Sequence, residues 1–91
     1  MSKISEQKKA KIKEDILLFL YEINPKAMFT KEVAEAVIRD EEFTKNLLLE
    51  LKRDNLVNEV DISEKGKKFL LRRRWQLTKG AFDAYAKLTS R

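Results

Sequence analysis

The sequence predicts a mainly α-helical fold with one small β-hairpin, which is an α+β class. The first observation behind this prediction is that residues 30–57 read as two short helices joined by a tight turn. Val33 and Val37 lie one helical turn apart, and apolar residues recur at helical spacing over residues 43–51. The second observation is the alternation of apolar and polar residues from Val60, which indicates a strand. The two helices are therefore a candidate helix-turn-helix.

Three residues are placed where they can cap a helix. Thr30 stands at the start of the first helix of this pair and Asp40 at the start of the second, and each offers a side-chain oxygen to free backbone N–H groups. Thr78 precedes another apolar stretch in the same way. We therefore expect a C-terminal helix over residues 78–90.

The helix-turn-helix segment follows a specific pattern without a gap, namely Glu32-Val33-Ala34-Glu35-Ala36-Val37, then Leu47-Leu48 with Leu51, and Leu56-Val57. This pattern resembles the helix-turn-helix of winged-helix transcription regulators of the MarR and PadR type. The resemblance implies a winged helix-turn-helix fold and a role in DNA binding. Two residues depart from the pattern. Ile38 stands where those families often have glycine in the turn, and Thr44 stands where they often have an aliphatic residue.

The segment before the helix-turn-helix is expected to hold one helix and a short strand. Residues 1–11 are polar and basic, and they either extend the first helix or remain frayed. From Ile12 an amphipathic pattern predicts a helix to about residue 22, which Asn24-Pro25 ends because proline disfavours helical geometry in the residue before it. Residues 27–29 can add a short strand to the edge of the wing.

Residues 57–77 are predicted to form the wing as a hairpin with its loop at residues 64–67. The competing interpretation is a helix capped by Ser63, because residues 69–74 contain no β-branched side chain. We prefer the hairpin because only it leaves room for a wing. Its register sorts apolar and charged residues onto separate faces. The expected pairs are Ile62 with Phe69, Val60 with Leu71, Leu56 with Trp75, and Glu59 with Arg72.

Length and composition exclude several classes of protein. A chain of 91 residues fits one domain over residues 1–91, and 43% apolar with 38% charged residues is too apolar for disorder and too charged for a membrane protein. No apolar run spans a bilayer and no signal peptide is visible, so we expect a cytoplasmic protein. The richness in Lys, Glu and Ile is compatible with a thermophilic archaeal source.

The sequence lacks the residues on which most enzymes and metal sites depend. It has no cysteine and no histidine, which removes thiolate ligands, the thiol nucleophile and the commonest general base. Its two glycines form no phosphate-binding loop. We therefore expect no enzymatic activity, no metal and no cofactor.

The resemblance implies that the second helix of the pair enters the DNA major groove. Asparagine can bind adenine through two hydrogen bonds and lysine can reach guanine, so the candidate base-reading residues are Thr44, Lys45 and Asn46. The alternative is that these positions are simply solvated, because Glu41 and Glu42 nearby repel phosphates. Leu49 and Leu17 lie off the main apolar stripes of their helices, where exposed leucines can mark a partner surface.

Cations gather in the predicted wing, with no acidic residue between Lys65 and Lys79 to neutralise them. If the hairpin lies beside a duplex, they can bind phosphates or enter the minor groove. The candidates are Lys65, Lys67, Lys68, Arg72, Arg73 and Arg74. Accessory phosphate contacts are expected from Lys8, Lys9, Lys11 and Arg53. Solvated charges and a frayed N-terminus remain the alternative for both sets.

Charge is segregated along the chain, whose formal net charge is +5. Residues 1–13 carry +4, residues 14–64 carry −7 and residues 65–91 carry +8. The first interpretation is a double-stranded DNA-binding regulator of transcription that forms a homodimer. The acidic middle segment supports a second interpretation, a protein-interaction module of transcription, replication or other machinery that binds a basic partner. A third is an RNA-binding or ribosome-associated protein.

Overall fold

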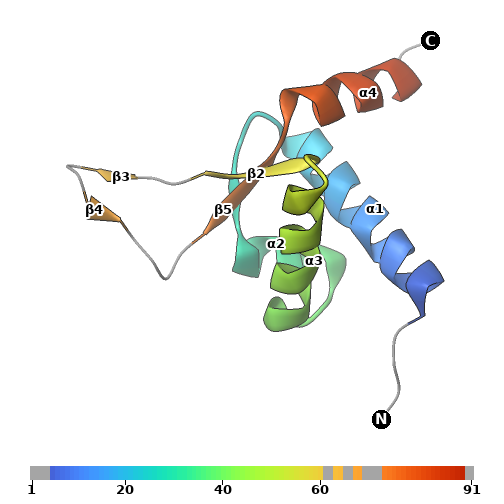
Figure 1. The fold of residues 1–91 in the computed structure, drawn as a ribbon, viewed down its shortest axis with the longest axis horizontal. Helices are drawn as coiled ribbons and strands as arrows, with labels where there is room; N and C mark the ends of the chain where they lie inside the picture. The colour runs from blue at the N-terminus through green and yellow to red at the C-terminus, as the bar shows by residue number, and fades with distance from the viewer. Residues whose placement is uncertain (1–4, 61–62, 65–66, 69–72, 90–91) are drawn as a thin grey trace.

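The structure, a computed structural model, describes residues 5–60, 63–64, 67–68 and 73–89. Within these residues the chain forms a mainly helical fold with a small antiparallel sheet, so the predicted fold class is confirmed (Figure 1). The elements in order are α1 (Glu6–Ile23), β1 (Met28–Phe29), α2 (Thr30–Val37), α3 (Glu41–Arg53), β2 (Val57–Val60), β3 (Ser63–Glu64), β4 (Lys67–Lys68), β5 (Arg74–Leu77) and α4 (Lys79–Thr89).

The sheet confirms the predicted hairpin and the predicted edge strand. β5 is its central strand and pairs antiparallel with β1 on one side and β2 on the other. β3 and β4 form a second antiparallel pair farther along the same hairpin. Glu64 pairs with Lys67 there, so the prediction of a loop at residues 64–67 is wrong for these two residues. Figure 1 shows the hairpin extending away from α2 and α3, as a wing does.

The register at the base of the hairpin differs from the predicted one. Trp75 pairs with Glu59, not with Leu56, and Val57 pairs with Leu77. The reason is that Val57, Trp75 and Leu77 are all buried and must face the core together. The predicted pairs of Glu59 with Arg72 and of Val60 with Leu71 are wrong for the same reason, because Glu59 pairs with Trp75 and Val60 with Arg74. The predicted pair of Ile62 with Phe69 lies outside the described residues.

The core lies between α1, α2, α3 and the inner face of the sheet. The predicted apolar stripe of α1 is confirmed, because Ile12, Ile16 and Leu20 are buried. Leu17 is buried beside them, so the prediction that it is an exposed leucine is wrong. α1 begins earlier than Ile12, since the Ser5 hydroxyl accepts a hydrogen bond from the Lys8 amide at 3.2 Å and starts the helix at Glu6. Part of the basic N-terminal segment is therefore helical.

Two of the three predicted caps are confirmed and one is wrong. Asp40 accepts from the Phe43 amide at 3.0 Å, and Thr78 accepts from the Ala81 amide at 3.1 Å. Thr30 does not cap α2. Its buried hydroxyl instead accepts a hydrogen bond from the Trp75 indole at 2.8 Å.

The turn between α2 and α3 explains why glycine would suit position 38. Ile38 adopts φ 57° and ψ 55°, the left-handed region that a β-branched side chain enters only with strain. Its side chain is 86% exposed, so packing does little to offset that strain. The turn therefore forms although its central residue, Ile38, is held in an unfavourable backbone conformation.

We predict that Ile38→Gly raises the free energy of unfolding. A left-handed residue other than glycine costs about 1–2 kcal/mol, and the extra freedom of glycine in the unfolded chain returns about 0.4–1 kcal/mol of this. The expected net gain is about 0.5–1 kcal/mol in urea unfolding followed by circular dichroism. Ile38→Asn, which also tolerates this conformation, should gain in the same direction, whereas Ile38→Val should not. A loss of stability in the glycine variant would contradict the strain argument.

Candidate nucleic-acid interface

α3 has one buried and one outward face. Leu47, Leu48 and Leu51 are buried against α1, α2 and the sheet. The predicted readers Lys45 and Asn46 lie on the outward side, and Asn46 is exposed. The Lys45 ammonium is 3.5 Å from the Glu42 carboxylate, one turn earlier in the helix. The structure thus places two of the three predicted base-reading residues on an accessible helix face.

The prediction for Thr44 is wrong. Its side chain is fully buried, and its Oγ1 atom has no hydrogen-bond partner among the described residues. Thr44 precedes Leu47, Leu48 and Leu51 by three, four and seven residues, which is the spacing of the buried stripe. The threonine therefore occupies the aliphatic position of the pattern and cannot contact a base.

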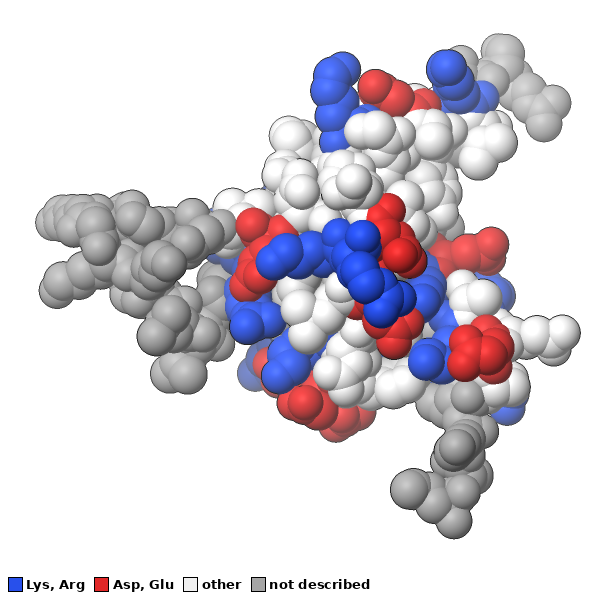
Figure 2. Space-filling view, viewed as in Figure 1, with Lys and Arg blue, Asp and Glu red and all other residues white. Residues whose placement is uncertain are grey.

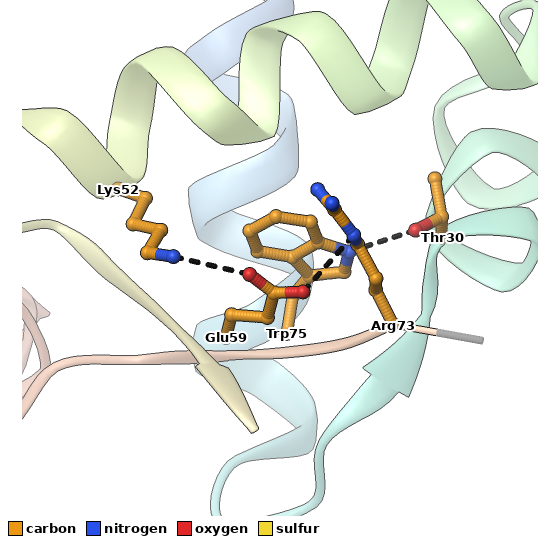
Figure 3. A network of polar contacts seen from close by, with 5 residues as sticks. All are labelled: Thr30, Lys52, Glu59, Arg73 and Trp75. Carbon is orange, nitrogen blue, oxygen red and sulfur yellow. Dashed lines mark hydrogen bonds and ion pairs between the residues drawn. The ribbon is translucent and has the colours of Figure 1, made fainter. Parts of the chain in front are cut away.

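Glu59 joins the base of the wing to α3. The sequence predicts it only as a partner of Arg72. The Glu59 carboxylate lies between two cations, with Lys52 Nζ of α3 at 3.1 Å and Arg73 Nε at 3.1 Å (Figure 3). Arg72, the predicted partner, lies outside the described residues. No sequence signal distinguished Arg73 from its neighbours, because the choice depends on the register. Glu59 therefore sets where Arg73 lies.

Arg74 is held differently, with its guanidinium group 4.9 Å from the centre of the Phe29 ring. This stacking fixes the arginine over β1, while Arg73 remains accessible with 41% of its side chain exposed. Both arginines lie where β5 begins, beside the start of α2. Of the other predicted wing cations, Lys67 and Lys68 form β4, and Lys65 and Arg72 lie outside the described residues.

The predicted accessory cations are largely engaged with carboxylates of the chain. Lys11 contacts Asp15 at 3.1 Å, and Arg53 contacts Asp54 at 3.7 Å. Lys9 contacts Glu50 of α3 at 3.7 Å. Lys8 lies exposed on α1.

Glu50 links α1 to α3. Besides Lys9, its carboxylate binds Lys13 at 2.7 Å, and this hydrogen bond is the main reason that the pKa of Glu50 lies below its ordinary value. Glu50 is therefore ionised at neutral pH. Lys9 and Lys13 therefore hold α1 against α3.

The surface beside α3 carries interleaved charges of both signs (Figure 2). A shallow depression between the starts of α2 and α3 gathers five carboxylates and three cations. Its charged residues are Glu32, Glu35, Asp40, Glu41 and Glu42 with Lys31, Lys45 and Arg73. Several acidic residues of the segment 14–64 thus gather where α3 begins.

The C-terminal helix packs through aromatic side chains. Tyr21 of α1 contacts Phe82 and Tyr85 of α4, with ring centres 5.2 and 5.7 Å apart. Burial raises the pKa of Tyr85, and the nearby Glu14 carboxylate adds to this. Leu88, on the same helix, is 72% exposed.

Within the described residues, no group of three or more acidic side chains is arranged to hold a metal ion. None of the helices in the described ranges is both long and apolar enough to cross a membrane.

No protein-family model matches the sequence, and no curated protein matches it. The fold is nevertheless similar to solved structures. With the DNA complex of MepR from Staphylococcus aureus it shares a TM-score of 0.72 and 20% identity, covering 92% of this chain and 73% of that chain. With a mutant of ZitR from Lactococcus lactis the TM-score is 0.69 at 17% identity, covering 92% and 58%.

A MarR family transcriptional regulator from Silicibacter pomeroyi is similar at a TM-score of 0.69 and 14% identity, covering 91% of this chain and 51% of that chain. The chain thus spans between half and three quarters of the length of these three proteins. At such identities the likeness shows the fold, which is the winged helix-turn-helix that the sequence predicts.

We predict that Thr44→Val stabilises the protein. Valine has nearly the same shape and removes a buried hydroxyl that lacks a partner, which costs about 1–3 kcal/mol where it occurs. The free energy of unfolding should rise by about 1 kcal/mol in chemical denaturation. Thr44→Ser, which keeps the hydroxyl and loses the methyl group, should be less stable than the wild type. A valine variant that unfolds more easily would show that the hydroxyl is satisfied after all.

Proposed function

We propose that this chain binds double-stranded DNA and regulates transcription, without enzymatic activity. The observation that carries the proposal is the outward face of α3, where Lys45 and Asn46 are accessible on a helix whose opposite face is anchored in the core. These two side chains match the hydrogen-bonding groups of guanine and adenine in the major groove. The likeness to the MepR–DNA complex supports the same use of this fold.

The hairpin supplies the contacts that do not depend on base sequence. Arg73 and Arg74 lie at the start of β5, where their positions are fixed by Glu59 and Phe29. Residues 65–91 carry a net charge of +8, which favours phosphate binding with release of counterions. Phosphate contacts of this kind orient the duplex while α3 distinguishes the bases.

A homodimer would let two copies of α3 reach successive turns of the major groove. Exposed leucines support such an interface. Leu18 on α1 and Leu88 on α4 lie outside the core, on the two helices that Tyr21 joins. A two-fold axis through these helices would pair each leucine with the same surface of the second copy.

A second candidate is a protein-interaction module, and one observation favours it. The carboxylates of Glu35, Glu41 and Glu42 lie in the depression at the start of α3, where they oppose phosphates and suit a basic protein partner. Nothing in this arrangement requires a base-reading helix. The two candidates therefore differ in whether the outward residues of α3 contact DNA.

The first experiment is fluorescence anisotropy of the protein with a random duplex and with DNA from upstream of its own gene, at two salt concentrations. The proposal predicts salt-sensitive binding to both and tighter binding to the upstream DNA. An RNA duplex of the same length should compete poorly, because a helix cannot read the narrow RNA major groove. Absence of binding at low salt would contradict the proposal and favour the protein-interaction module.

Two double variants separate the roles of the helix and the hairpin. Lys45→Ala with Asn46→Ala should lower the affinity for upstream DNA to that for the random duplex, because binding to the random duplex does not depend on base reading. Arg73→Ala with Arg74→Ala should weaken binding to both duplexes and reduce the salt slope by about 2. A charge-matched control, Lys79→Ala with Lys87→Ala on α4, should change the salt slope much less. Equal effects of the two charge-matched variants would assign the binding to net charge rather than to the hairpin.

A further inference from the structure

We propose that Leu49 reads DNA sequence by contacting the 5-methyl group of a thymine beside the base pair bound by Asn46. This inference rests on the proposed binding of α3 in the major groove, and it extends the set of reading residues by one apolar side chain. It also replaces Thr44, which the structure removes from that set.

The position of Leu49 on the helix carries the argument. At about 100° per residue, Leu49 lies close to Asn46 and Glu42 and roughly opposite the buried stripe. The neighbouring leucines at 47, 48 and 51 are at most 2% exposed, whereas Leu49 is 36% exposed. Leu49 therefore contributes little to the core and stands among polar residues on the outward face.

Four outward residues of α3 form one continuous reading strip, in which the later three follow the first by three, four and seven residues. The recognition helix of the homeodomain reads the major groove with residues at this same spacing. The strip consists of Glu42, Lys45, Asn46 and Leu49. Its first two members are joined by their ion pair, which leaves Asn46 and Leu49 as the neutral pair at its C-terminal end.

The chemistry of the groove identifies what Leu49 can bind. The thymine methyl group is the apolar feature on the major-groove edges of the four standard base pairs, and apolar side chains recognise it by contact. Asn46 and Leu49 are separated by about 4.5 Å along the helix, which lies between one and two base-pair steps of about 3.4 Å. A site with adjacent A·T pairs would satisfy both side chains.

The test uses a duplex selected by the wild-type protein from a random library in vitro. Each thymine is then replaced in turn by deoxyuridine, which keeps base pairing and removes only the methyl group. One replacement should weaken wild-type binding about fourfold, the equivalent of one buried methyl group. Leu49→Ala should bind the thymine and uracil duplexes equally, with affinity close to that of wild type on uracil.

Ile38→Ala is the matched control, because it removes an exposed apolar side chain outside the reading strip. It should keep the full difference between thymine and uracil. If Leu49→Ala keeps that difference too, or if no uracil replacement weakens the wild type, the inference is wrong while DNA binding stands. If the wild type selects and binds no duplex, both the inference and the proposed function are overturned.

Discussion

The hydrogen bond from the Trp75 indole to the Thr30 hydroxyl, 2.8 Å long and fully inside the core, connects the two halves of the fold (Figure 3). A buried indole N–H must find an acceptor, and the acceptor here stands at the first residue of α2. Trp75 is also the central residue of the sheet, paired with Met28 on one side and Glu59 on the other. One side chain thus sets the position of the wing relative to the helix-turn-helix.

Ion pairs on the surface around the Trp75–Thr30 contact fix the positions of several cations and also compete with phosphates for them. Glu59 holds Arg73 and Lys52, and Glu50 holds Lys13, so these carboxylates fix cations that would otherwise extend freely into solvent. Surface ion pairs contribute little stability, typically about 0–1 kcal/mol. Their larger effect is on geometry, because a duplex that binds Arg73 must compete with Glu59 for the guanidinium group.

Apolar spacing predicted the helices and most of the core, because burial follows periodicity regardless of distant partners. The assignment of roles by residue type failed for threonine, whose hydroxyl can bind a base, cap a helix or lie in the core. Thr44 looked like a reader because of its hydroxyl, although its spacing to Leu48 already indicated burial. Thr30 looked like a cap, and its actual partner is 45 residues away in sequence. The register of β5 depends on tertiary packing, which no local pattern contains, whereas the backbone strain at Ile38 lies where the turn pattern often has glycine.

If the chain binds DNA as proposed, the outward face of α3 and the base of the wing form one DNA-binding surface. Two-dimensional NMR of the labelled protein titrated with a short duplex tests it residue by residue. The amide signals of α3, from Glu42 to Arg53, are expected to shift together with those of Arg73 and Arg74, while those of α4 change little. Shifts confined to α1 and α4, or absent from α3, would contradict it.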